Sequence, residues 1–272
     1  MRPPLSKDTT LCISLAARPS NIGTRFHNHL YDRLGLDFIY KAFTTTDIEA
    51  AIGGVRALGI RGCSVSMPFK EAVIPLVDTV EPSARAIHSV NTIVNDKGRL
   101  TASNTDYLAV QRLIDDNGLE PGDAVLIRGS GGMASAVGAA FRDSGFHSGI
   151  VVARNPEAGR ALADRLGYDY APEVGARTAP IIVNVTPIGM AGGPEESETA
   201  FADSTIAKAS VVFDVVALPS ETPLIKAARE RGVKVITGAE VIALQAAEQF
   251  ERYTGVRPTP EQVAEASAIS RA

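Results

Sequence analysis

Residues 125–134 read Val-Leu-Ile-Arg-Gly-Ser-Gly-Gly-Met-Ala, an apolar strand-like run followed by Gly-x-Gly-x-x-Ala and then by a helical pattern. In a dinucleotide-binding turn the first glycine, here Gly129, permits the tight turn, and the second, Gly131, lets the backbone approach a pyrophosphate. The small Ala134 lets helix and strand pack closely, and the helix N-terminus offers N–H groups to the anion. An ordinary glycine-rich turn is the alternative. We expect dinucleotide contacts from Gly129, Ser130, Gly131, Gly132, Met133 and Ala134.

The strand after this helix distinguishes NADP from NAD. It ends in Ala153-Arg154-Asn155, without the carboxylate that bonds the ribose 2′-hydroxyl in NAD-preferring folds. A guanidinium matches a 2′-phosphate in charge and in forked geometry. The sequence therefore favours NADP, with Arg154 at the 2′-phosphate and with Ala153 and Asn155 expected beside it in the cofactor site. The alternative for Arg154 is a solvated surface arginine.

Alternating strand and helix patterns surround the glycine turn. They predict strands at 124–127, 149–153, 181–185, 211–215 and 233–236, and helices at 132–144 and 156–166. Such a series is typical of a parallel sheet covered by helices, which here is a Rossmann domain. Two amphipathic helices, at 239–253 and 259–270, have no strand after them and could pack on either domain.

The first hundred residues show a similar alternation, with a hairpin signal at Asp96-Lys97-Gly98. Strands are expected at 11–15, 38–43, 60–67 and 90–95, and helices at 24–34 and 47–58. The predicted fold class is α/β with two domains, an N-terminal mainly parallel α/β substrate domain and a C-terminal Rossmann NADP-binding domain. The boundary is expected between residues 105 and 120, within or just after a helix near 104–117.

Composition excludes several classes of protein. The 272 residues carry a net charge of -4, which argues against a general nucleic-acid binder. No apolar run is long enough for a membrane span, and the N-terminus lacks the pattern of a signal peptide. Two cysteines are too few for a disulfide framework, and the four histidines show no metal-ligand spacing. We expect a cytoplasmic protein that binds no metal, membrane or nucleic acid.

Two polar clusters interrupt the apolar patterns of the first domain. Ser66 and Lys70 follow a predicted strand, where ligands of α/β sheets gather. Asn91 lies in the second cluster, and Asp106 lies where the chain crosses between domains. Oxidation of an alcohol requires a group that takes the hydroxyl proton, which a lysine can do beside a carboxylate. The alternatives are a surface lysine and a carboxylate that stabilises a helix N-terminus.

These motifs, in this order, resemble the shikimate dehydrogenase family over nearly the whole chain. In the first half, residues 65–70 (Val-Ser-Met-Pro-Phe-Lys) are similar to the family's V-T-V/M-P-F-K, residues 90–92 match its V-N-T, and residues 104–106 match its N-T-D. In the second half, residues 129–134 are similar to its G-A-G-G-A-[AS], and residues 184–190 (Asn-Val-Thr-Pro-Ile-Gly-Met) are similar to its N-x-T-[PS]-x-G-M. Gly238 and Gln245 fall in the C-terminal G-x6-Q stretch.

The resemblance implies reversible interconversion of shikimate and 3-dehydroshikimate with NADP, within aromatic amino acid biosynthesis by the chorismate pathway. It implies a substrate-binding and catalytic domain at 1–106, completed by helices at about 240–272, and an NADP-binding domain at 107–239. Lys70 is implied to transfer the proton with Asp106 as its partner. Ser66, Asn91 and Gln245 are implied to hold ring hydroxyls, and Thr186, Val215 and Gly238 are expected to join the cofactor-binding residues.

This sequence departs from the family at the substrate site. The family's Ser-x-Ser, which binds the substrate carboxylate, falls on Asn21-Ile22-Gly23, although Ser20, Asn21 and Thr24 could supply donors. A tyrosine of the family is replaced by Ala217, and the usual threonine at Ser66 is a serine. These departures resemble the shikimate dehydrogenase-like branch, so slower turnover of shikimate is expected.

Other interpretations stay open. Quinate or an amino-substituted shikimate could suit the altered site, a non-catalytic NADP-sensing protein could keep the fold, and a folate-type dehydrogenase shares the layout. The expected partner is a small ring acid, and the chain is expected to be a monomer or a homodimer.

Overall fold

The computed structural model describes residues 2–271 and separates into two compact units. The first unit contains the chain up to Thr105 together with the segment from Ala243 onward, and the second contains Asp106–Ile242. Two continuous helices, α4 (Thr105–Asp116) and α9 (Gly238–Thr254), carry the chain across the two boundaries. The chain returns to the first unit at Ala243, so most of α9 and the segment after it are part of that unit.

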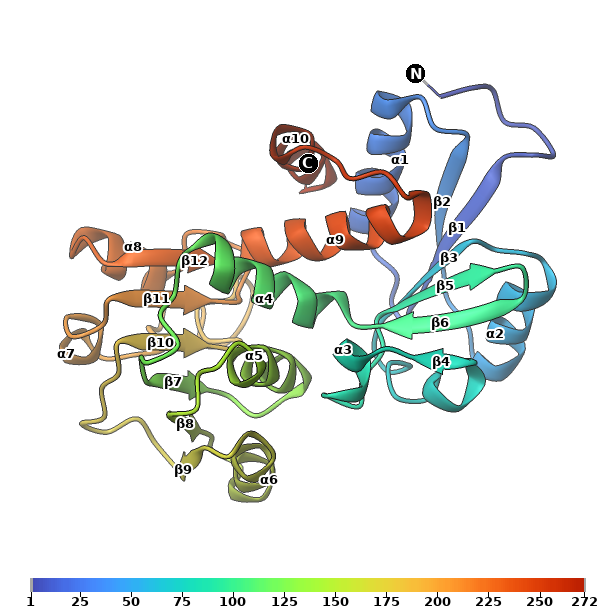
Figure 1. The fold of residues 1–272 in the computed structure, drawn as a ribbon. Coiled ribbons are helices and arrows are strands. Elements are labelled where there is room, and N and C mark those ends of the chain that lie inside the picture. The colour runs from blue at the N-terminus through green and yellow to red at the C-terminus, as the bar shows by residue number, and fades with distance from the viewer. Residues whose placement is uncertain (1, 272) are drawn as a thin grey trace. The chain divides into compact units, whose positions relative to one another are not determined.

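The second unit is built on a six-stranded parallel sheet in the order β12-β11-β10-β7-β8-β9 (Figure 1). Its strands are β7 (Val125–Arg128), β8 (Gly149–Val152), β9 (Asp169–Ala171), β10 (Ile181–Asn184), β11 (Val211–Asp214) and β12 (Lys234–Thr237). The central strands are apolar at nearly every position because helices cover both faces of a parallel sheet. This strand order, with β7 at the switch point, is that of a dinucleotide-binding Rossmann fold.

Four helices beyond α4 cover this sheet. They are α5 (Gly132–Asp143), α6 (Pro156–Leu166), α7 (Asp203–Ile206) and α8 (Pro223–Glu230). The ends of α6 show how the local sequence sets them. The side-chain oxygen of Asn155 accepts hydrogen bonds from the N–H groups of Glu157 and Ala158, and Gly167 ends the helix in the left-handed conformation.

The first unit contains a mixed six-stranded sheet in the order β2-β1-β3-β5-β6-β4. Its strands are β1 (Thr10–Leu15), β2 (Phe38–Phe43), β3 (Gly62–Val65), β4 (Thr79–Val80), β5 (Thr92–Asp96) and β6 (Arg99–Ser103). The pairs β1–β2, β1–β3 and β4–β6 are parallel, whereas β5 pairs antiparallel with both neighbours. The predicted hairpin forms, with Lys97 and Gly98 at positive φ. The α/β fold class predicted from the sequence is confirmed.

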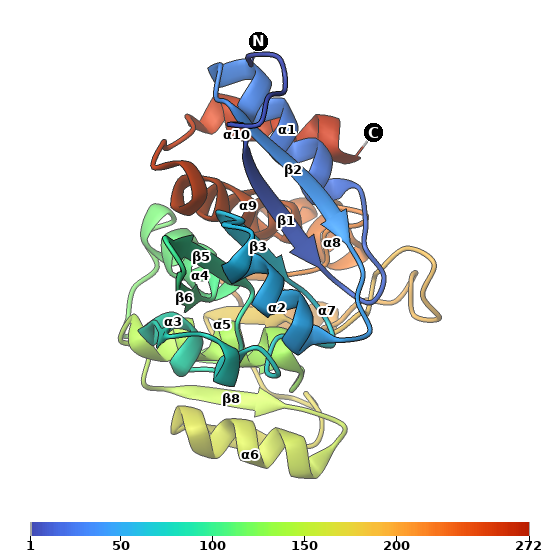
Figure 2. The same cartoon turned by 90° about the vertical axis from the view of Figure 1, so that its right-hand side faces the viewer.

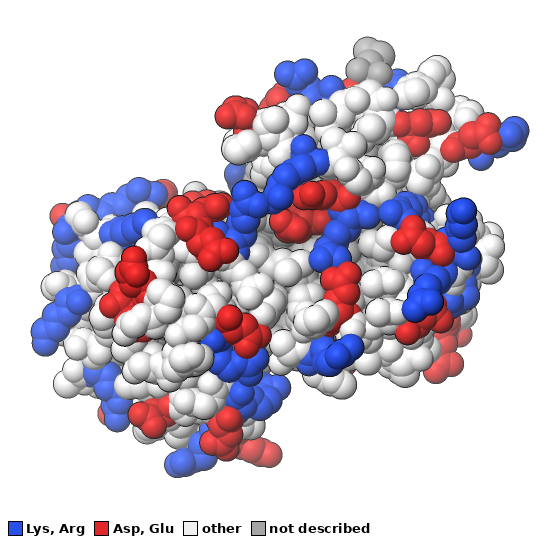
Figure 3. Space-filling model, viewed as in Figure 1, with Lys and Arg blue, Asp and Glu red and all other residues white. Residues whose placement is uncertain are grey.

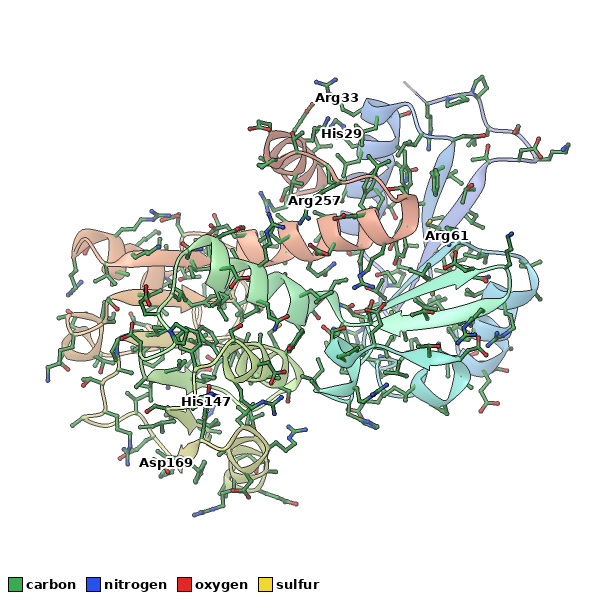
Figure 4. The ribbon with its side chains drawn as sticks, viewed as in Figure 1. His29, Arg33, Arg61, His147, Asp169 and Arg257 are labelled. Atoms are coloured by element: carbon green, nitrogen blue, oxygen red, sulfur yellow. The ribbon has the colours of Figure 1, made fainter. Side chains whose placement is uncertain are left out.

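The helices of the first unit come from both ends of the chain. They are α1 (Ile22–Leu34), α2 (Ile48–Ala57), the short η1 (Ile74–Leu76), α3 (Pro82–Arg85), most of α9, and α10 (Pro260–Arg271). Helix α10 lies beside α1 (Figure 2). His29 and Arg33 of α1 both reach the carboxylate of Glu265 on α10, at 3.4 and 3.7 Å (Figure 4).

An aromatic cluster joins α1, α9 and β2 in the core of this unit. The ring of His27 stacks on Tyr40 with centroids 4.4 Å apart, and Phe250 and Tyr253 of α9 lie against it. Burial favours the neutral imidazole and lowers the pKa of His27 to about 3. Arg61, which precedes β3, donates from Nε to the carbonyl of Tyr253 at 3.0 Å (Figure 4). Helix α9 is therefore part of the core that supports β3.

The surface carries both signs of charge. On the face shown in Figure 3, lysine and arginine side chains are interspersed with aspartate and glutamate. Among residues 2–271, every helix is too short or too polar to cross a lipid bilayer.

Candidate cofactor and substrate sites

The glycine turn after β7 has the geometry that its two roles require. Gly129 has φ 131°, and a Cβ there would lie 2.9 Å from the carbonyl oxygen of Val185, so only glycine is tolerated. Gly131 has an ordinary extended backbone, and a Cβ there would meet no protein atom within 4 Å. Gly129 is therefore required by the fold itself, whereas Gly131 leaves open space beside the backbone.

Helix α5 begins directly at this space. Gly131 is its N-cap residue and supplies no side chain, and the carbonyl of Gly131 accepts from the N–H of Ser135. The N–H groups of the first turn, at Gly132, Met133 and Ala134, have no acceptor within the helix. These donors and the positive end of the helix dipole suit an anion. Ala134 is fully buried, which agrees with a packing role against the strand.

A cavity of about 600 Å³ opens at the carboxyl ends of β7, β8 and β10. It is lined by seven of the predicted cofactor residues, Gly129, Ser130, Gly131, Ala153, Arg154, Asn155 and Thr186. The predicted residues Gly132, Met133, Ala134, Val215 and Gly238 do not line it. Val215 and Gly238 instead lie together at the ends of β11 and β12, where a Cβ on Gly238 would come within 2.3 Å of the carbonyl oxygen of Val215.

Sequence reasoning missed other parts of this cavity. The loop of Pro172–Gly175 after β9 lines it, as do Val185, Pro187 and Ile188 around the predicted Thr186, and Val152, Ala200 and Ala202. Arg128 also lines it, directly before the first glycine. A charged residue at the end of an otherwise apolar strand was the signal that could have found Arg128. The loop after β9 gave no such signal because β9 has only 3 residues.

A buried polar network holds Thr186 in the cavity wall. The side-chain oxygen of Asn184 accepts from Thr186 Oγ1 at 2.6 Å and from Thr186 N at 3.1 Å. The amide nitrogen of Asn184 donates to Asp214 at 3.0 Å, and Asp214 also accepts from Thr222 Oγ1 at 2.6 Å and from Val216 N at 3.1 Å. Burial nevertheless dominates and raises the pKa of Asp214 to about 6.

This raised pKa makes stability depend on pH with a defined sign. The folded state binds the Asp214 proton more tightly than the unfolded chain, whose carboxyl has a pKa of 3.8. The stabilisation is complete below pH 4 and is lost as the pH rises through about 6. The free energy of unfolding can be compared between the unmodified protein and Asp214→Asn at each pH. We expect the value of the unmodified protein to fall by about 3 kcal/mol relative to that of the variant from acidic to neutral pH.

Urea denaturation of both proteins across this range measures the difference. Asp203→Asn, at an exposed carboxylate paired with Arg231, is the matched control and should show no comparable trend. The assignment would be contradicted if the stability of the unmodified protein, relative to that of Asp214→Asn, stayed constant or increased as the pH rises.

In the first unit, hydrogen bonds bring three predicted segments together. The side-chain oxygen of Asn91 accepts from Thr105 N at 2.8 Å and from Thr92 Oγ1 at 2.8 Å. The backbone carbonyl of Lys70 accepts from the N–H of Val90 at 2.8 Å. The loop that carries Lys70, the Asn91 segment and the start of α4 therefore meet. Lys70 is half-buried, and Asp106, which is half-buried too, directly follows Thr105 in the chain.

Gln249 on α9 completes this cluster and was not predicted. It is buried, and its side-chain nitrogen donates to Thr92 Oγ1 at 3.0 Å and, at 3.3 Å each, to the carbonyl of Asn91 and to Ser64 Oγ. The predicted Gln245 lies one helical turn earlier, on the same face of α9. Ser66 is exposed at the carboxyl end of β3. The sheet and helix α9 thus supply polar groups to one region of the first unit.

Helix α1 follows β1 in the chain, after the loop of residues 16–21. Its N-cap residue, Asn21, makes no side-chain capping bond, and Ser20 and Asn21 are exposed. Thr24 Oγ1 is buried, and no hydrogen-bond partner for it exists among the described residues. A Cβ on Gly23 would contact the ring of Tyr40 at 3.5 Å. The site of the expected carboxylate contacts is therefore a helix N-terminus with polar side chains around it.

Among residues 2–271, no three histidine, cysteine, aspartate or glutamate side chains gather so that they could hold a metal ion.

The parallel sheet and the glycine turn together define a two-unit α/β protein with a dinucleotide-binding Rossmann fold. The family model described as "Shikimate dehydrogenase substrate binding domain" matches residues 21–93. A "Shikimate dehydrogenase-like protein" of Haemophilus influenzae is 58% identical over 98% of each chain. The chain therefore belongs to the shikimate dehydrogenase family, an NADP oxidoreductase family of aromatic amino acid biosynthesis, and the predicted likeness to its shikimate dehydrogenase-like branch is confirmed.

Two solved structures agree with this assignment. A shikimate 5-dehydrogenase-like protein superposes with a TM-score of 0.98 at 58% identity and covers 99% of this chain and 100% of its own. Shikimate 5-dehydrogenase of Thermus thermophilus, solved in complex with NADP(H) and shikimate, has a TM-score of 0.82 at 29% identity and covers 96% of this chain and 99% of its own.

Proposed function

We propose that this protein is an NADP-dependent dehydrogenase that interconverts shikimate, or a close ring analogue, with the corresponding 3-keto acid, and that it is slower on shikimate than the main branch of its family. The main support for this proposal is the hydrogen-bonded polar cluster of the first unit. In this cluster Thr92 and Thr105 fix the side chain of Asn91 beside the loop that carries Lys70. The buried, unbridged cysteines Cys12 and Cys63 suit the cytoplasm, where we propose that it acts.

The second unit suits NADP in shape and in donors. The open space at Gly131 and the unpaired N–H groups at the start of α5 suit a pyrophosphate, and Arg154 is the cation for a 2′-phosphate. The cavity of about 600 Å³ has the size of a cofactor site. When bound there, NADP supplies the hydride acceptor. The protein's own task is then to orient the ring and to move the hydroxyl proton.

Lys70 and Asp106 are proposed to handle that proton. Lys70 accepts it from the substrate hydroxyl, and Asp106 holds the lysine and the hydroxyl in place. The side-chain oxygen of Asn91 is already bonded inside the protein, so its amide N–H groups are the part that can donate to a ring oxygen. Ser66 and Gln245 are proposed as further hydroxyl partners.

The substrate carboxylate is proposed to lie at the N-terminus of α1. The helix offers N–H groups without a side-chain cap, and Ser20, Asn21 and Thr24 surround them. The family's paired hydroxyls and its tyrosine are absent at Asn21, Gly23 and Ala217. Each missing hydrogen bond is worth about 0.5–1.5 kcal/mol, which favours a raised KM for shikimate or a different ring acid.

Initial rates with shikimate, quinate and aminoshikimate, each with NADP and with NAD, test the substrate. The expected result is a saturable NADP-dependent rate with at least one ring acid. Tight NADPH binding without turnover of any of the three would overturn the substrate assignment and favour a non-catalytic, cofactor-sensing role.

Arg154→Ala tests the choice of cofactor. The side chain is 80% exposed, so the loss of its charge-assisted bond to a 2′-phosphate is expected to raise the KM for NADP about tenfold. The KM for NAD should change little because NAD has no phosphate at this position. An equal rise of the KM for both cofactors would show that Arg154 does not bind the 2′-phosphate.

A further inference from the structure

Two arginines in the wall of the cavity of the second unit lie close to one glutamate beside it. Arg128 and Arg154 both line it and come from the ends of the neighbouring strands β7 and β8. A carboxylate oxygen of Glu195 lies 3.7 Å from Nη1 of Arg154. The guanidinium of Arg128 donates a hydrogen bond to the carbonyl of Ala200, another residue of the cavity wall. Two cations and one anion therefore share this corner.

The charges of this corner do not balance. Arg128 is half-buried, and its burial lowers the pKa of the guanidinium, while the charge of Arg154 acts in the same direction and that of Glu195 opposes both. Glu173 also lines the cavity, from the loop after β9, but the charges that act on Arg128 are those of Glu195 and Arg154. The carboxylate of Glu195 thus acts on two arginines that repel each other. An additional anion between them would relieve that repulsion, because it would pair with both guanidinium groups.

We propose that Arg128 is a second residue that selects the 2′-phosphate of NADP, and that Glu195 competes with this phosphate for Arg154. The proposal rests on the proposed NADP-dependent function and adds two residues that set its selectivity. Arg128 adds a second cation for the phosphate. Glu195 opposes the phosphate by charge but can accept a hydrogen bond from a free 2′-hydroxyl, as acids do in NAD-preferring folds.

The two residues therefore act in opposite directions on the same preference. Loss of the Arg128 charge should weaken binding of a 2′-phosphate and leave NAD unaffected. Loss of the Glu195 charge should strengthen binding of the phosphate, because Arg154 is then released from its ion pair. The balance between the two sets how strongly this cavity prefers NADP to NAD.

Calorimetric titration of the full chain tests this without any turnover. The probes are NADP, NAD, 2′-AMP and 5′-AMP, and the variants are Arg128→Leu, Arg128→Lys and Glu195→Gln. Arg229→Leu and Glu221→Gln are the matched controls, because these residues form an exposed ion pair at 3.1 Å in the same unit. Thermal unfolding of each variant verifies that it is folded, and Arg128→Lys keeps the charge if the leucine variant is unstable.

The expected result is that Arg128→Leu weakens NADP and 2′-AMP about tenfold, that Arg128→Lys restores most of this, and that Glu195→Gln strengthens both about threefold. NAD and 5′-AMP should change less than twofold in Arg128→Leu. Equal weakening of all four probes by Arg128→Leu, or a loss of NADP affinity in Glu195→Gln, would overturn this inference alone. Unmodified protein that binds neither dinucleotide would overturn the proposed function as well.

Discussion

Replacement of Lys70 by alanine is expected to lower kcat by about 10²–10⁴ while the protein stays folded. The amine is proposed to take the hydroxyl proton as hydride leaves the ring carbon, and alanine offers no group for this step. Lys70 is half-buried in the loop after β3, and its backbone carbonyl accepts a hydrogen bond from Val90 that alanine retains. The KM for NADP should therefore change little.

Steady-state kinetics with a saturating ring acid, together with circular dichroism of the variant, measure this effect. Lys7→Ala is the matched control, because Lys7 is an exposed lysine of the same unit paired only with the neighbouring Asp8. A variant at Lys70 with unchanged kcat would remove this residue from the proton-transfer step.

Gly131→Val is expected to abolish dinucleotide binding without unfolding the protein. The backbone at Gly131 has φ -82° and ψ -171°, which valine adopts readily, and a Cβ there meets no protein atom within 4 Å. The added side chain would instead fill the space proposed for the pyrophosphate. Affinity for both NADP and NAD should fall by about 100-fold or more, because the pyrophosphate would lose hydrogen bonds to the helix N–H groups that are worth about 1.5–3 kcal/mol each.

Fluorescence titration with NADPH and NADH measures the loss, and thermal unfolding measures the stability. Gly122→Val is the matched control, because Gly122 is also exposed in open space but lies in the turn before β7. Gly131→Val protein that still binds NADPH normally would show that the pyrophosphate does not approach this turn.

The parts of the fold that follow from local sequence were predictable. Helix α6 agrees with its predicted bounds because Asn155 caps it, Pro156 begins it and Gly167 ends it. The short elements were not predicted, because β4, β9 and α7 contain only 2, 3 and 4 residues and are too brief to show a period. Their positions depend on pairing with neighbours that are set elsewhere in the chain.

The same distinction holds for the candidate sites. The glycine turn and Arg154 are encoded within about thirty residues, as dinucleotide sites usually are. Gln249 could not be found in this way, because it reaches Ser64 across 185 residues of sequence and only the docking of α9 on β3 brings them together. Glu195 is likewise an ordinary acidic residue in sequence, and only its ion pair with Arg154 gives it a role.

The measurement that tests the account most directly is the rate of NADP reduction by the purified protein as shikimate concentration is raised. We expect a saturable rate that is higher with NADP than with NAD and that is lost in Lys70→Ala. A protein that binds NADPH but reduces no NADP with shikimate or its close analogues would contradict the account.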